Sequence, residues 1–159
     1  MSRADLTVAV DVDAPAADVW TAVTDWPGQG EWMLGTAVRV DGPGDGRALG
    51  ARLVATTGVG PLAVRDPMEI VEWDPPRRCV VRHLGAVVRG EGVFEVVELG
   101  PGRAQFAWTE ALELPLGRLG ALGWPLVRPA FRWGVLLFSI GAVACCLMIV
   151  APRRAPSRS

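Results

Sequence analysis

The chain has 159 residues, half of them apolar, which is enough for one domain with a substantial core. It contains no Lys, Tyr or Asn, so a Schiff-base lysine, a catalytic tyrosine and N-linked glycosylation are excluded. None of its four serines lies in a G-x-S-x-G motif, which excludes a serine hydrolase of that type. The absent residues have AT-rich codons, which indicates a bacterial source with a high-GC genome.

The formal net charge of −1 hides an asymmetry along the chain. Residues 1–100 hold 15 acidic residues and 9 arginines, whereas residues 101–159 hold 2 acidic residues and 7 arginines. The basic half has no run of basic residues interleaved with aromatic ones, so no nucleic-acid partner is expected. One histidine and the cysteines Cys79, Cys145 and Cys146 give no metal-ligand spacing, so no metal or other cofactor is expected.

The first third of the chain predicts a strand followed by two short helices. Apolar and polar residues alternate over 6–13, which is typical of a half-buried strand. Pro15 suits the first turn of a helix that stops at 26–28, and a second helical turn is expected at 29–33. The apolar stripe of the first helix is formed by Val19, Trp20 and Val23. Because the N-terminus lacks an apolar signal core, the domain is expected to fold in the cytoplasm.

Regular turn signals follow, and they divide the next part of the chain into strands. Gly- and Pro-rich turns are predicted at 42–46, 58–61, 74–76, 90–92 and 100–102. The Val-rich segments between them have strand length and cover 36–41, 48–57, 63–73, 78–88, 91–99 and 103–113. Short turns between successive strands predict an antiparallel meander.

A long helical run is expected to end the chain, after the Pro- and Gly-rich approach at 114–129. A seven-stranded sheet with one apolar face needs a cover, and this helix is the only element long enough to supply it. The sequence therefore predicts an α+β helix-grip fold. This fold has a seven-stranded curved antiparallel sheet, two short helices and a long C-terminal helix, and the domain is expected to span 3–137.

The last helix is unusually apolar for a sheet cover. Residues 133–152 form a run of 20 residues without a charge, which as a helix would measure about 30 Å, the thickness of a bilayer's hydrocarbon core. Arginines flank the run at Arg128, Arg132, Arg153, Arg154 and Arg158. Two interpretations stay open: its outer side contacts another subunit, or residues 133–151 form a membrane anchor. Residues 152–159 are predicted to be a basic, disordered tail.

Two polar residues are predicted to point into the apolar side of the sheet. One face of strand 103–113 consists of Ala104, Phe106, Trp108, Glu110 and Leu112. Glu110 is thus a carboxylate in an apolar row, and the lone His83 falls in the row of its own strand that has no arginine. Such a pair could hold a ligand hydroxyl or carbonyl, or transfer a proton. Alternatively, it is a satisfied polar pair that braces the sheet.

An apolar lining around this pair is predicted from aromatic and sulfur-containing side chains. It consists of Trp32, Met33, Phe94, Phe106 and Trp108. The same pattern is also typical of an ordinary core. Several charged residues, among them Glu72, Arg77, Arg78 and Glu95, are expected on solvated strand faces or at hairpin ends.

Three segments of the sequence carry a family resemblance. Residues 10–32, with Asp13-Ala14-Pro15-Ala16-Ala17-Asp18-Val19-Trp20, resemble the opening of the polyketide cyclase/dehydrase and lipid-transport family of the START-like (SRPBCC) superfamily. Residues 72–78 (Glu-Trp-Asp-Pro-Pro-Arg-Arg) are similar to its strand-turn-strand signature. Trp108-Thr109-Glu110 is similar to the strand before its final helix. The resemblance covers residues 5–137 and implies a helix-grip fold that binds lipids, polyketides or other apolar molecules; some members are aromatases or cyclases.

Three functions remain open from the sequence, and the first is favoured. It is a non-enzymatic carrier or sensor of a hydrophobic small molecule, working at a membrane if the last helix is an anchor. The second is a cyclase or dehydrase in which His83 is the general base and Glu110 orients it or the substrate. The third is an assembly module that acts through the last helix and binds no ligand.

Overall fold

A computed structural model of the chain describes residues 3–33, 35–58, 60–85 and 89–113. The cover predicted at 133–151 and the tail predicted at 152–159 lie outside these ranges, and with them the choice between subunit contact and membrane anchor. Cys145 and Cys146 lie outside them too. Among the described residues, no helix has both the length and the apolar character to cross a bilayer.

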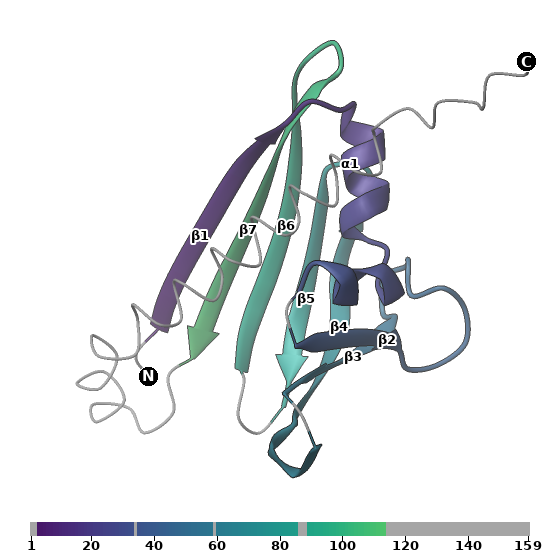
Figure 1. Ribbon diagram of the computed structural model, residues 1–159, viewed down its shortest axis with the longest axis vertical. Coiled ribbons are helices and arrows are strands. Elements are labelled where there is room, and N and C mark those ends of the chain that lie inside the picture. The colour runs from purple at the N-terminus through teal and green to yellow at the C-terminus, as the bar shows by residue number, and fades with distance from the viewer. Residues whose placement is uncertain (1–2, 34, 59, 86–88, 114–159) are drawn as a thin grey trace, which may run out of the picture.

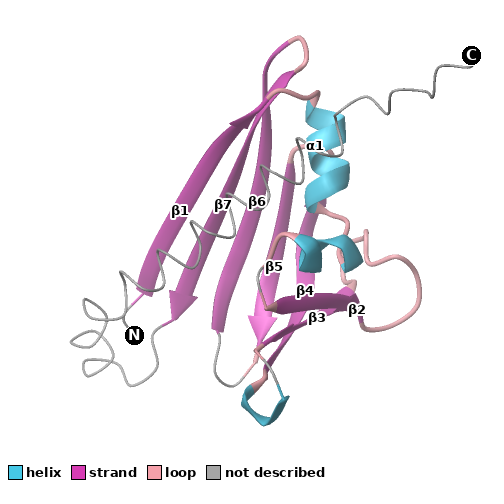
Figure 2. Ribbon diagram, viewed as in Figure 1, coloured by secondary structure: helices cyan, strands magenta, loops and turns pink. Residues whose placement is uncertain are grey.

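The described residues form one curved sheet with short helices near its two ends. The strands are β1 (Arg3–Val12), β2 (Thr36–Val40), β3 (Arg52–Thr57), β4 (Val64–Asp74), β5 (Arg78–Leu84), β6 (Arg89–Gly100) and β7 (Arg103–Glu113). The helices are α1 (Ala16–Val23) and the short 3₁₀ helices η1 (Pro27–Glu31) and η2 (Gly60–Leu62). Figure 2 shows α1 near one end of the long strands and η2 near the other.

The sheet is an antiparallel meander to which the first strand is added at one edge. Its seven strands run in the order β1-β7-β6-β5-β4-β3-β2, so every strand from β2 to β7 pairs with its neighbour in sequence. β1 pairs with β7, and Figure 1 shows these two strands side by side. The predicted meander and seven-stranded α+β helix-grip class are confirmed. Short turns enforce this order, because antiparallel neighbours need only a few connecting residues.

One strand boundary differs from the prediction in a way that matters for function. β6 begins at Arg89, so Gly90 and Gly92 lie within a strand rather than in the predicted turn at 90–92. Paired glycines usually mark a turn because they are free to adopt positive φ. Here Gly90 does adopt a φ of 125°, yet both residues remain paired with β7.

A β-bulge between β4 and β5 reverses the alternation of β4. Ile70 pairs with Val81 and Glu72 pairs with Val80, so Val71 is the extra residue. Strict alternation from Ile70 would turn Glu72 inward. The bulge instead turns Trp73 toward the core, where it packs against Trp20.

An aromatic cluster fills the core below α1 and η1. The ring centroids of Trp73 lie 5.1 Å from Trp20 and 6.4 Å from Trp26, and Trp26 lies 6.4 Å from Phe94. Trp26 also donates a hydrogen bond of 3.0 Å from its indole nitrogen to the carbonyl of Gly46. Trp20 of α1 is thus joined to the sheet, and Trp26, which follows α1, joins the same aromatic cluster to the loop between β2 and β3.

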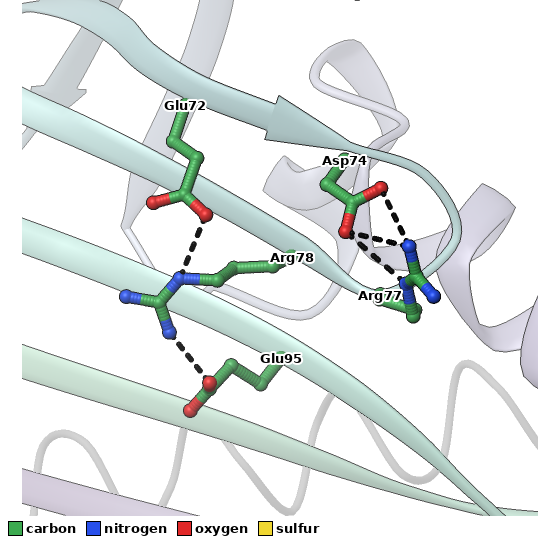
Figure 3. A network of polar contacts seen from close by, with 5 residues as sticks. All are labelled: Glu72, Asp74, Arg77, Arg78 and Glu95. Carbon is green, nitrogen blue, oxygen red and sulfur yellow. Dashed lines mark hydrogen bonds and ion pairs between the residues drawn. The ribbon is translucent and has the colours of Figure 1, made fainter.

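The outer face of the sheet carries ion pairs between neighbouring strands. The guanidinium of Arg78 contacts the carboxylates of Glu72, at 3.1 Å, and of Glu95 (Figure 3). Arg77 pairs with Asp74 at 3.1 Å across the β4–β5 turn. The side chains are 36–72% exposed, which confirms that these residues lie on solvated faces. Exposed pairs of this kind contribute little to stability, because solvent screens them.

The loop contact of Trp26 makes Gly46 a sensitive position. Its φ is 76°, and an added Cβ would lie 2.9–3.0 Å from side-chain atoms of Val40, Leu53 and Trp26. We expect Gly46→Ala to lower the free energy of unfolding by about 3 kcal/mol, from backbone strain and overpacking together. Gly44→Ala is the control, because its φ is also positive, at 89°, but nothing lies within 4 Å. It should cost only about 1 kcal/mol. Equal losses in denaturant unfolding would contradict the packing argument.

Candidate functional site

A histidine held between two carboxylates lies on the inner side of the sheet. The Nδ1 atom of His83 lies 2.6 Å from Oδ2 of Asp66, and its Nε2 atom lies 3.3 Å from Oε2 of Glu110. The other oxygen of Glu110 accepts a hydrogen bond of 2.7 Å from the indole nitrogen of Trp108. The side chains of His83, Asp66 and Glu110 are only 7%, 15% and 11% exposed. We call Asp66, His83 and Glu110 the buried cluster.

The residues of the buried cluster come from three strands, and the register between these strands explains how the three side chains come together. His83 in β5 pairs with Met68 of β4, and Asp66 precedes Met68 by two residues, so it points to the same side. Glu110 belongs to β7, which is separated from β5 by the whole width of β6. Since neighbouring strands lie about 4.8 Å apart, the two side chains must bridge roughly 10 Å.

The bridge is possible because β6 has no side chain at this level. The residue of β6 paired with His83 is Gly90, and the residue paired with Glu110 is Gly92. We call these two positions the glycine gap. The fit is close, because a Cβ added to Gly92 would lie 3.1 Å from both Oε1 of Glu110 and Cγ2 of Val81.

The two carboxylates fix the protonation state of the histidine. Burial by itself would lower the pKa of His83, but the hydrogen bonds and negative charges of Asp66 and Glu110 outweigh it and raise this pKa from 6.5 to about 10. At neutral pH the ring is therefore an imidazolium that donates from both nitrogens. In this form it can give up a proton but cannot accept one, which disfavours the general-base role considered from the sequence.

The sequence reasoning missed Asp66, although the signal that identified Glu110 was also present there. Asp66 alternates with Met68 and Ile70 within the predicted strand 63–73, so it too is a carboxylate in an apolar row. Its Oδ1 atom is buried and has no hydrogen-bond partner among the described residues. An orphaned carboxylate oxygen in a nearly buried site needs an explanation.

The predicted lining residues fall into two groups. Phe94, Phe106 and Trp108 are buried together, with Phe94 5.5 Å from Phe106 and 5.6 Å from Trp108 in edge-to-face contacts. Trp108 joins this group to the buried cluster through Glu110. Trp32, which is buried, and Met33, which is half-buried, instead lie at the end of η1.

A hollow of about 400 Å³ lies at the end of β5 and β6. Its lining consists of Arg82, His83, Leu84, Gly85, Arg89, Gly90, Glu91 and Ala111. By strand alternation His83, Gly85 and Gly90 belong to the inner side and the others to the outer side, so the hollow spans the rim of the sheet. Its size falls within the usual range for small-molecule pockets, about 300–1,000 Å³.

Among the described residues, neither a metal-ligand set nor a reactive cysteine forms a further site. Within the described ranges, no set of three His, Cys, Asp or Glu side chains could hold a metal ion. In the buried cluster this follows from the geometry, because each ring nitrogen faces a different carboxylate. Burial, assisted by the charge of Glu72, raises the pKa of the Cys79 thiol to about 12, which leaves it an unreactive core side chain.

The family to which the chain belongs is shown by comparison with known protein families. The model of the family described as polyketide cyclase / dehydrase and lipid transport matches residues 3–135. The chain belongs to this family. The resemblance inferred from residues 10–32, 72–78 and 108–110 is thus confirmed. A comparison with curated proteins gives no match.

Solved structures share the fold of this family member. A protein from Thermus thermophilus aligns with a TM-score of 0.76 and 19% identity, covering 93% of this chain and 100% of that one. The Zhui aromatase/cyclase from a Streptomyces species aligns with a TM-score of 0.67 and 19% identity, covering 93% of both chains. A START superfamily protein from Mycobacterium smegmatis aligns with a TM-score of 0.72 and 14% identity, covering 91% of this chain and 98% of that one. At such identities the likeness shows the fold alone.

The charge state of the buried cluster can be measured directly, because His83 is the only histidine in the chain. We expect its ring protons, observed by NMR in untagged protein, to show no titration between about pH 6 and pH 8. Asp66→Asn and Glu110→Gln each remove one charge that stabilises the imidazolium, so each should lower the pKa of His83 by about one unit or more. A midpoint near 6.5 in the unmodified protein would refute the ion-pair assignment.

The control for these variants is Glu91→Gln. Glu91 lies between the two glycines of β6 but points to the outer face, where it pairs with Arg82 at 3.1 Å. The same charge is removed from the same part of the sheet, yet the pKa of His83 should not change, because an exposed charge across the sheet is screened by solvent.

Proposed function

We propose that this protein binds a hydrophobic small molecule against the inner side of its sheet, with the buried cluster as the polar contact. The observation that carries the proposal is a buried imidazolium that borders an apolar face and lies in the lining of a hollow of about 400 Å³. The lining of the hollow holds Arg82, Arg89 and Glu91 beside His83, and the buried apolar side chains of Phe94, Phe106 and Trp108 lie outside it. Ligand pockets typically combine an apolar lining with a few polar groups that fix orientation, so the ligand would have to reach from this polar rim to the apolar inner side. The family description, which includes lipid transport, supports the same class of ligand.

Stability alone does not account for the buried cluster. Removing three charged side chains from water costs several kcal/mol per ion, and the attraction between them offsets this only when the geometry is complete. Apolar residues of similar volume would serve the core of this sheet equally well or better. The outer face, where Arg78 pairs with Glu72 and Glu95 in contact with solvent, links neighbouring strands without that cost. A binding role explains why the charges lie inside.

A cyclase or dehydrase activity is the second candidate, favoured by the 3.3 Å contact between His83 and Glu110. Loss of water from a substrate requires a proton for the departing hydroxyl. The imidazolium of His83 carries such a proton, but its raised pKa makes it a weak acid, and a substrate would have to take the place of one of its two carboxylate partners. Glu110, fixed by Trp108, would then orient the ring. This assignment reverses the direction of proton transfer considered from the sequence.

Native mass spectrometry of gently purified full-length protein tests both candidates. We expect an apolar molecule to be retained with the protein and released by organic solvent. His83→Gln should reduce its retention about tenfold, because it removes the imidazolium that pairs with both Asp66 and Glu110 and so disrupts the polar end of the site. Arg77→Gln, which removes a charge from an exposed turn, should leave retention unchanged.

The form of the retained molecule separates a carrier from a dehydrase. A carrier should hold the same molecule in both the unmodified protein and His83→Gln. A dehydrase variant should retain a species heavier by one water, because the step that needs the proton is blocked. If folded protein retains nothing and takes up no added apolar probe, both candidates are wrong.

We also propose that residues 133–151 contact a membrane, as their charge-free run flanked by arginines suggests. In cell fractionation, the full chain should sediment with membranes and a chain truncated after Arg132 should not. Circular dichroism must show that the truncated chain retains its sheet. Recovery of both chains in the same fraction would refute the proposal and favour the assembly role of this segment.

A further inference from the structure

One carboxylate oxygen of the buried cluster accepts no hydrogen bond from the described residues. The ring nitrogens of His83 are directed at Oδ2 of Asp66 and Oε2 of Glu110, and the indole nitrogen of Trp108 is directed at Oε1 of Glu110. Three of the four carboxylate oxygens therefore have donors. The fourth, Oδ1 of Asp66, has none among the described residues, although it is buried.

The positive and negative charges of the buried cluster do not balance. With both ring nitrogens facing carboxylates, His83 carries one positive charge against two negative ones. Within the part of the chain that the structure describes, neither Asp66 nor Glu110 forms an ion pair with an arginine. A surplus of one negative charge in a nearly buried site favours a donor or a cation and opposes an anion.

Small residues lie beside two members of the buried cluster, Asp66 and His83. On β3, the residue paired with Asp66 is Ala55, and on β6, the residue paired with His83 is Gly90. His83 and Gly90 both line the hollow at the rim of the sheet. A polar group entering from the inner side would therefore meet short side chains beside Asp66 and His83, whereas Leu6 of β1 pairs with Glu110 at the other end of the cluster.

We infer that the ligand carries a hydrogen-bond donor, a hydroxyl or an ammonium group, which it presents to Oδ1 of Asp66, and that molecules ending in a carboxylate are rejected. This inference rests on the proposed binding function and names its ligand class. A carboxylate would place acceptor against acceptor and add a second uncompensated charge. Sites built to pair one polar group discriminate strongly against a partner that leaves it unpaired.

Three amphiphiles with the same alkyl chain test the ligand class: decanol, decylamine and decanoate. Each is used below its micelle concentration, at neutral pH, to displace the neutral fluorophore Nile red from the full-length protein. We expect decanol and decylamine to displace it at concentrations about tenfold lower than decanoate, which corresponds to one unmatched buried hydrogen bond. Asp66→Asn should remove this preference, because its amide can donate to the carboxylate.

The matched control is Asp11→Asn, which makes the same chemical change at an exposed residue of β1 that pairs with Gln105 and Arg103. It should keep the preference of the unmodified protein. The ranking in the unmodified protein tests the inference even if Asp66→Asn fails to fold. Displacement by all three molecules at similar concentrations would overturn the inference, and so would a preference that survives in folded Asp66→Asn; either result would leave the proposed function standing. Failure of folded protein to bind Nile red and all three amphiphiles would overturn both.

Discussion

The absence of two side chains on β6 is the constraint on which the candidate site depends. His83 and Glu110 lie on strands that are not neighbours, and their contact crosses the glycine gap at Gly90 and Gly92. A methyl group at Gly92 would already press on the Glu110 carboxylate. The two strands that carry this contact are each hydrogen-bonded to a neighbour on both sides. β5 lies between β4 and β6, and β7 lies between β6 and β1. The polar groups are therefore held by the sheet itself, which is a more rigid support than a loop.

The two faces of the sheet use the same chemistry under different conditions. On the outer face, Arg78 joins Glu72 and Glu95 where water screens all three side chains, so each pair adds little to stability. On the inner face, the side chains of the buried cluster are only 7–15% exposed, so every missing partner is costly. A histidine suits the inner position because its ring reaches carboxylates in two directions with one charge. The protonation of His83 is then a consequence of its location rather than a property of the residue.

The alternation of apolar and polar residues within each strand predicted which side chains face inward. It did not predict which residues of different strands come into contact. His83 and Glu110 were predicted to face inward because their strands are regular, and the same rule applied to 63–73 would have added Asp66. It failed where the strands are irregular: the bulge at Val71 turns Trp73 inward, and Gly90 and Gly92 have turn-like composition but belong to a strand. The meeting of Asp66, His83 and Glu110 depends on the register between strands, which a single-strand pattern does not contain.

The inner side of the sheet is aromatic toward one end of the strands and charged toward the other, and this difference bears on how a ligand would lie. Below α1 and η1 the core contains a chain of ring contacts that runs from Trp20 through Trp73 and Trp26 to Phe94. Toward the opposite end of β5 and β7, Trp108 is the last ring before the carboxylate of Glu110. Polarity thus changes along the strands within a short distance, from rings to charges. A molecule with one apolar end and one donor group would match this gradient, whereas a purely apolar molecule would leave the charged end without a partner.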